Sequence, residues 1–327
     1  KLSNLKKVGL TALASSLVAV TAHAGDVSVS GGASMKVQNH SGNSNASTGK
    51  ALKMGNQLTF TGGGELENGL TVGISFVIDQ GDDAGDSTAD DNGTSPFDSH
   101  SITVSSDTLG TLSMAGEGTN DAAGSIDTTA AGDIWNYTFT SFETPLAAAS
   151  GSGTLKYTTP ELTDGLTLVA SLAPKSTATA AGTSVGYGIN YTGIDGLTVN
   201  LATAENNSAV NKEDEMNVMK ASYAYGPVTV AVSQNEYDAQ VATDSQEVSS
   251  YAISYTVSEN ISISYGSETH EDDAASTPND AEFTSYSASY TAGGMTISAI
   301  AIDAENVDFN ATVDDSEYWG LTASFAF

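Results

Sequence analysis

Apolar and polar residues alternate with a period of two along most of the chain, and the spacing of an amphipathic helix is nearly absent. In "ISISYGS", Ile261, Ile263 and Tyr265 share one face, whereas Ser262 and Ser264 share the other. The pattern predicts sixteen strands, nearly all of them long enough for a tilted strand to cross a membrane, which takes about 9–11 residues. We expect them at residues 26–37, 52–66, 70–80, 98–107, 110–117, 152–159, 166–175, 183–193, 197–206, 217–226, 228–238, 248–258, 261–270, 283–293, 295–306 and 316–327.

The connections between these strands are alternately long and short. The short ones are turns such as "GP" (226–227), "EN" (259–260) and "GG" (293–294), whose residues suit tight hairpins because they tolerate positive φ. The longest of the long connections is the third, residues 118–151. Long loops on one side and tight turns on the other predict an even-stranded, antiparallel up-and-down meander. The same asymmetry is typical of transmembrane β-barrels, which have long outer loops and short periplasmic turns.

The two faces of the predicted strands differ in a way that favours a membrane. One face carries Leu, Val, Ile and Tyr, and the other carries Ser, Thr, Asn and Gly, which would make a poor protein core. A half-exposed soluble sheet would bury its apolar face inside, but sixteen strands leave little apolar material for a second layer. We therefore predict an all-β, 16-stranded transmembrane barrel with apolar residues toward lipid and a wet interior of small side chains. In the last strand, Phe325 and Phe327 should face lipid, with Trp319 and Tyr318 in an aromatic girdle at the opposite interface.

The N-terminal segment has the features of a secretion signal. Three lysines are followed by the apolar run Val8–Val20, and Ala22-His23-Ala24 gives the small-x-small pattern of a cleavage site before Gly25. A membrane anchor would need roughly 18 or more apolar residues, and this run is shorter. We expect residues 1–24 to be a cleaved signal peptide and residues 25–327 to form the barrel, exported through the inner membrane.

Charge and composition exclude several classes of function. Residues 25–327 contain 7 lysines and no arginine against 40 acidic residues, a formal balance of −33, which argues against nucleic-acid binding. An enzyme is not expected, because the chain has no cysteine and no G-x-S-x-G elbow, and His40, His100 and His270 fall in or beside outer loops. Acidic clusters in the second and seventh long loops could hold Ca²⁺, but their spacing does not match an EF-hand. Solvated acidic loops are the favoured interpretation, and no cofactor is expected.

Two internal stretches carry a family resemblance. "DTLGTLSMAGEG" (107–118) is similar to a strand that enters the third loop of general porins, and "LKYTTPELTDGLTLVASL" (155–172) resembles the hairpin that follows that loop. With the aromatic C-terminus, the whole chain resembles the Gram-negative general (trimeric) porins, in particular the alphaproteobacterial type. The resemblance implies a homotrimer in the outer membrane, in contact with the bilayer and lipopolysaccharide, whose third loop (118–151) folds into the lumen.

The resemblance further implies a pore constriction in which loop carboxylates face basic side chains on the wall. Each candidate wall lysine alternates with apolar neighbours and should point inward, although any strand lysine must avoid hydrocarbon whatever its function. Because the basic groups are all lysine, whose ammonium is a flexible point charge, we expect the constriction to be less selective than an arginine-rich one. The candidates are Lys36, Lys53, Lys156 and Lys220 on the wall, Asp121, Asp127 and Asp133 on the loop, and Glu117 just before it.

The predicted function is a passive, water-filled diffusion channel for small hydrophilic solutes and ions. The acidic mouth and lumen should favour cations. Two alternatives stay open: a substrate-specific outer-membrane channel, and a non-conducting structural or adhesive surface barrel that is plugged by its own third loop.

Overall fold

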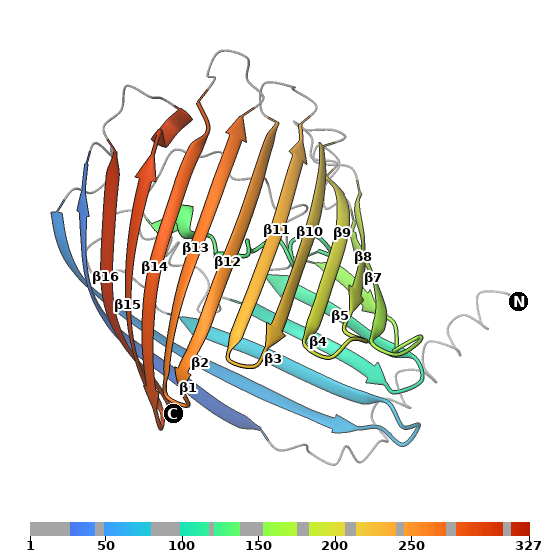
Figure 1. The fold of residues 1–327 in the computed structure, drawn as a ribbon. Helices are drawn as coiled ribbons and strands as arrows, with labels where there is room; N and C mark the ends of the chain where they lie inside the picture. Colours follow the sequence, from blue (N-terminus) through green and yellow to red (C-terminus); the bar gives the residue numbers. More distant parts are fainter. Residues whose placement is uncertain are drawn as a thin grey trace, which may run out of the picture.

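Sixteen antiparallel strands close into a single barrel (Figure 1). The computed structural model describes residues 27–42, 49–79, 99–117, 121–137, 153–174, 183–206, 214–239, 245–272, 279–309 and 315–327. Within these residues each strand pairs with its neighbours in sequence, and the last strand pairs with the first. The predicted fold class is therefore confirmed, whereas the predicted signal peptide, residues 1–24, lies outside the described residues.

The strands agree with the predicted sixteen in number and order, and they differ mainly at their ends. β1, for example, continues to Ser41 rather than ending at residue 37. The strands are β1 Ser28–Ser41, β2 Gly49–Glu65, β3 Thr71–Asp79, β4 Ser99–Ser106, β5 Gly110–Glu117, β6 Thr154–Thr158, β7 Leu166–Ala173, β8 Ser184–Tyr191, β9 Leu197–Asn206, β10 Asp214–Tyr225, β11 Val228–Asp238, β12 Gln246–Ser258, β13 Ile261–Asp272, β14 Ala281–Ala292, β15 Met295–Glu305 and β16 Ser316–Ala326. Two short 3₁₀ helices, η1 (Ile134–Tyr137) and η3 (Val307–Phe309), accompany them.

Tight turns join the strands at one end of the barrel, the lower end in Figure 1. The turn between β10 and β11 is formed by residues 226–227, and that between β14 and β15 by residues 293–294. Gly226 has φ 57° and Gly293 has φ 60°, a left-handed conformation that a residue with a Cβ adopts only at a cost. The sequence therefore places glycine where the two-residue hairpins require it.

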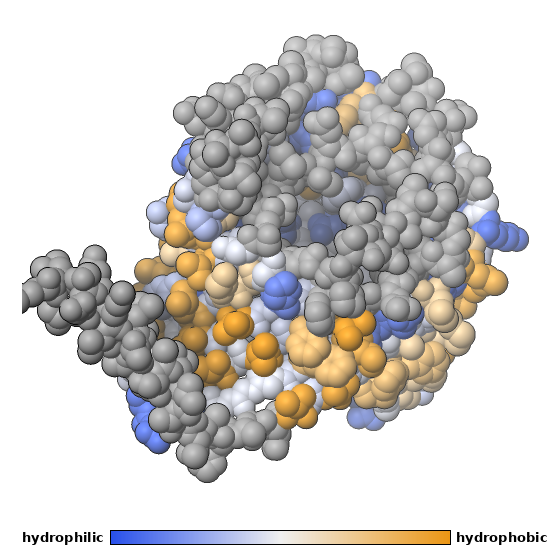
Figure 2. Space-filling model, turned by 180° about the vertical axis from the view of Figure 1, so that it is seen from behind, coloured by the Kyte–Doolittle hydropathy of each residue, from blue (hydrophilic) through white to orange (hydrophobic). Residues whose placement is uncertain are grey.

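The outer surface of the wall is apolar. On β1 and β2, Met35 is 60% exposed and Leu52 is 75% exposed, while Lys36 and Lys53 between such residues are half-buried on the inner side. Figure 2, a view from behind, shows apolar side chains spread over the outer face of the wall. A closed sheet satisfies its backbone hydrogen bonds internally, so this apolar surface is compatible with hydrocarbon around it. Within the described residues, no helix has both the length and the apolar character needed to span a bilayer.

The interior departs from the prediction of small, wet side chains throughout. A buried apolar cluster inside the barrel joins η1 to β14, β15 and β16, and it includes Ile134, Phe283, Ile302 and Tyr318. The prediction that Tyr318 belongs to an interfacial girdle is wrong, because this side chain is only 2% exposed and its hydroxyl donates to Gln38 Oε1 at 3.3 Å. The physical reason is parity: Tyr318 alternates with Trp319, which is 42% exposed on the outer face.

Candidate functional site

Residues 121–137, which we call the loop-3 segment, lie against the inner face of the wall. In Figure 1 the segment is the green trace that passes inside the barrel behind β11–β14. It begins at β7, where Ala122 N donates to Ser171 Oγ at 2.9 Å, and it reaches β1, where Lys36 Nζ lies 5.1 Å from the centre of the Tyr137 ring. The segment therefore crosses the lumen along more than half of the wall.

Wall side chains from successive strands bind the backbone of this segment. Lys220 Nζ on β10 donates to Thr128 O at 2.6 Å, and Ala130 N donates to Ser233 Oγ on β11 at 2.8 Å. Further bonds run from Asn235 Nδ2 to Asp127 O, from Ala131 N to Ser250 Oγ (3.0 Å) and from Ile134 N to Glu268 Oε1 (3.1 Å). Because each net hydrogen bond contributes about 1 kcal/mol, the set fixes the path of the segment.

Two of the candidate lysines meet one of the candidate carboxylates at a single cavity. Lys36 and Lys53 stand opposite each other in the register of β1 and β2. Both line a polar cavity of about 700 Å³, and Asp133 and Tyr137 of the loop-3 segment line it from the other side. Charges of both signs thus border the same space inside the barrel.

The three loop carboxylates have raised pKa values, chiefly because they are partly buried. Burial, followed by the neighbouring Asp133 and Asp121, raises the pKa of Asp127 to about 6. Burial also raises the pKa of Asp133, against hydrogen bonds from Thr129. Burial raises the pKa of Asp121 as well, although amide donors and the charge of Lys156 oppose that shift. The segment therefore loses its negative charge at a higher pH than solvated aspartates would.

The remaining candidates lie elsewhere. Lys156 on β6 lies close enough to Asp121 to act on its pKa, so this pair is at the β6–β7 side of the lumen. Lys220 contacts the loop backbone and serves as an anchor of the segment. Asp121 is only 3% exposed and its Oδ1 accepts from Gly124 N at 2.8 Å, which holds the first turn of the segment. The side chain of Glu117, at the end of β5, lies outside the described residues.

Glu268 was not predicted as a site residue from the sequence, yet it makes three hydrogen bonds to the loop-3 segment. Its side chain is fully buried, and its carboxylate accepts hydrogen bonds from Thr129, Ile134 and Trp135. The strand parity of "ISISYGSETHED" could have found it, because position 268 shares the polar face of Ser262 and Ser264. What parity could not give is its partner, since that depends on the path of a loop.

Two of the described histidines, His40 and His270, are buried inside the barrel, whereas His100 is exposed. His270 lies near the end of β13, beside the following long connection, and is 1% exposed inside the barrel, where its ring contacts Trp135 and Phe283. His40 is also buried, with its ring 4.9 Å from that of Tyr318. In the described part of the chain, no group of three or more His, Cys, Asp or Glu side chains is placed to hold a metal ion. Most of the acidic second loop, including Asp82 and Asp83, lies outside the described residues.

Comparisons with known proteins agree with this architecture. The chain matches the Gram-negative porin family over residues 9–291. Among solved structures, it is similar to a triple mutant of the porin of Rhodopseudomonas blastica, with 14% identity, a TM-score of 0.66, and 92% of this chain and 100% of that chain covered. It is also similar to a loop-deletion mutant of OmpT, an outer membrane protein of Vibrio cholerae, with 14% identity, a TM-score of 0.66, and 93% and 100% covered. No curated protein sequence gives a significant match.

A closed sixteen-stranded barrel with an inward-folded segment defines the structural class of the molecule, and the family match over most of its length gives the assignment. The chain belongs to the Gram-negative porin family.

Proposed function

We propose that the protein is a passive diffusion channel of the outer membrane for small hydrophilic solutes and ions. The observation that carries the proposal is the polar cavity inside the barrel, bordered by Lys36 and Lys53 on the wall and by Asp133 on the loop-3 segment. A solute that passes this point exchanges water for polar groups of both signs. Without a fixed stereochemical binding site, size and charge are then the properties on which it is selected.

We further propose that the channel prefers cations. The formal balance of −33 over residues 25–327 makes the potential of the whole molecule negative, and carboxylates of the loop-3 segment add acidic groups inside the barrel. A negative cleft with low-dielectric walls raises the local concentration of cations. The effect should weaken in salt water, because the screening length is about 8–10 Å at physiological ionic strength.

Family membership supports proposals about the membrane environment and the assembly of the protein. Membership supports an outer-membrane location, and we propose a homotrimer whose apolar outer face contacts lipid and lipopolysaccharide. Calcium at the acidic outer loops stays the less favoured alternative to solvated loops, and cleavage after residue 24 stays a prediction.

One alternative has a specific observation in its favour. The loop-3 segment fills part of the lumen with a buried apolar cluster, so a barrel plugged by its own loop would be folded but non-conducting. A substrate-specific channel would instead show saturable block of the current by one nutrient.

Planar-bilayer recording under a KCl gradient tests the proposal. We expect discrete channel openings and a reversal potential whose sign corresponds to a preference for K⁺ over Cl⁻. Preference for Cl⁻ would contradict the cation claim. Absence of conductance from protein that migrates as a folded, heat-modifiable species would contradict the channel and favour the plugged barrel.

A further inference from the structure

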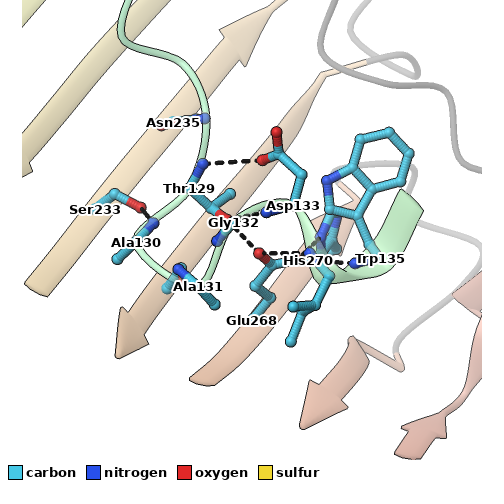
Figure 3. Close-up of polar contacts among 12 residues, drawn as sticks. Thr129, Ala130, Ala131, Gly132, Asp133, Trp135, Ser233, Asn235, Glu268 and His270 are labelled. Atoms are coloured by element: carbon cyan, nitrogen blue, oxygen red, sulfur yellow. Dashed lines mark hydrogen bonds and ion pairs between the residues drawn. The ribbon is translucent and has the colours of Figure 1, made fainter. Parts of the chain in front are cut away.

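A single buried carboxylate on the wall holds the turn that carries Asp133 (Figure 3). Glu268 Oε1 accepts from the hydroxyl of Thr129 and from Ile134 N at 3.1 Å, and its Oε2 accepts from Trp135 N at 3.1 Å. Both oxygens are thus used, and all three donors come from the loop-3 segment. A carboxylate accepts more strongly than a neutral group, so all three bonds are charge-assisted.

The turn itself is closed around the same threonine. Thr129 Oγ1 accepts from Gly132 N at 3.1 Å and from Asp133 N at 2.8 Å, while Thr129 N donates to Asp133 Oδ1 at 2.9 Å. The hydroxyl of Thr129 therefore joins three partners: it donates to Glu268 and accepts from two amides. Asp133 has φ 54°, a left-handed conformation that the surrounding bonds must hold in place.

The wall is shaped to let the turn approach. Gly266 lies two residues before Glu268 on the same face of β13, and a Cβ built at this position would lie 2.8 Å from Ala131 Cβ. That distance is shorter than non-bonded carbon atoms tolerate. Glycine at 266 and glutamate at 268 therefore act together, the first by leaving room and the second by binding.

We propose that Glu268 is the positioning residue of the constriction: it fixes the Thr129–Trp135 turn and so sets where Asp133 stands opposite Lys36 and Lys53. The inference rests on the proposed channel function. It assigns control of the channel's ion selectivity to Glu268, which does not line the described cavity. It also implies that the narrow part of the pore is a fixed structure.

We call the hydrogen bonds between Glu268 and the Thr129–Trp135 turn the latch. Removing the latch should release the turn, which carries Asp133, into the lumen. Glu268→Gln keeps the volume but offers one acceptor oxygen in place of two, and its amide group turns a donor toward a backbone N–H. Thr129→Val removes the shared hydroxyl without changing the formal charge of the chain, so a change in ion selectivity in this variant does not come from the loss of a charged residue. Thr129→Ser keeps the hydroxyl and is the conservative counterpart.

The experiment measures single-channel conductance, current noise and reversal potential on the full chain in planar bilayers. For Glu268→Gln and Thr129→Val we expect added sub-conductance states, more open-channel noise and a reversal potential displaced toward zero. Thr129→Ser should behave as the wild type. The matched control is Glu282→Gln, the same charge change at an exposed position on the neighbouring strand β14.

Amide hydrogen exchange over residues 129–135, in detergent, is the second readout and needs no conductance. Faster exchange is expected in Glu268→Gln and Thr129→Val and unchanged exchange in Glu282→Gln. Wild-type exchange and wild-type currents in both Glu268→Gln and Thr129→Val would overturn the role of Glu268. A silent wild-type channel with accelerated exchange in those variants would instead overturn the proposed function and leave the latch standing.

Discussion

Lys36 on β1 and Lys53 on β2 are directly opposite each other in the barrel register, and both line the cavity that Asp133 borders. Like charges in such a pair repel, and Lys36 Nζ lies 5.1 Å from the Tyr137 ring and 5.5 Å from the Tyr318 ring. A cation near an aromatic face is stabilised by the ring quadrupole. The wall thus concentrates positive charge at one place in a strongly acidic molecule.

Lys53→Gln should increase the preference for cations, because it removes part of the local barrier to them. Two unit charges about 4 Å apart in water interact by about 1 kcal/mol, so the permeability of K⁺ should rise and that of Cl⁻ should fall by up to about five-fold each, and the K⁺/Cl⁻ permeability ratio rises by the product of the two changes. Reversal potentials under a KCl gradient give this ratio. Lys50→Gln is the control, since Lys50 lies on the opposite face of β2 and is exposed; an equal change in both variants would refute a local effect.

Cation preference should fall as the pH is lowered through about 6. The pKa of Asp127 is raised to about 6 by burial and by the neighbouring carboxylates, so this group becomes neutral below that pH. Asp121 and Asp133 also have raised pKa values and should follow before a solvated aspartate, whose pKa is about 3.9, would. The reversal potential, measured from about pH 8 to about pH 4, should show the step.

Asp127→Asn separates this titration from that of the outer loops. The variant should lose the part of the step that lies near pH 6 and keep any change at lower pH. A step of unchanged size in Asp127→Asn would assign the titration to other carboxylates.

Gly266→Ala should displace the loop-3 segment. The added methyl would lie 2.8 Å from Ala131 Cβ, and overpacking of this kind typically costs about 1–3 kcal/mol. We expect altered single-channel conductance from a barrel that still folds. Gly32→Ala is the matched control on β1, where a Cβ would meet only Phe325 O at 3.8 Å; it should conduct as the wild type, and an unchanged Gly266→Ala would contradict close packing at the wall.

Ser250→Ala should loosen the segment at Ala131. Ala131 N donates to Ser250 Oγ at 3.0 Å, and a lost hydrogen bond of about 1 kcal/mol corresponds to roughly five-fold faster amide exchange when exchange follows a fast local opening equilibrium. Exchange at Ala131, resolved by NMR, checks this. Ser249→Ala removes a hydroxyl from the exposed face of the same strand and should leave that amide unchanged.

The strands and their lipid-facing positions could be predicted because period-2 alternation is local and recurs in every strand. Met35 and Leu52 show how directly parity reports orientation when one side of a sheet faces hydrocarbon. The same rule, applied to each position in turn, would have placed Tyr318 and His270 inside. The prediction for Tyr318 is wrong because it relies on the position of an aromatic residue near a strand end rather than on strand parity.

The arrangement of the site could not be predicted to the same degree. Lys36 and Lys53 were identified by parity, but their common cavity with Asp133 depends on where a long loop runs. Lys220 and Glu268 illustrate the limit, because one binds the loop backbone and the other binds three groups of a turn remote in sequence. No short-range pattern encodes contacts of that range.

The barrel is sealed where Gly31 and Phe327 exchange backbone hydrogen bonds of 2.7 and 3.0 Å, next to the pairing of β1 with β16. Because synthesis proceeds from the N-terminus, β1 leaves the ribosome long before the strand that covers its edge exists. Until then the growing sheet has two open edges, which are templates for aggregation. The sheet can therefore close only after β16 has been made, and until then the free edge of β1 is open to pairing with other chains.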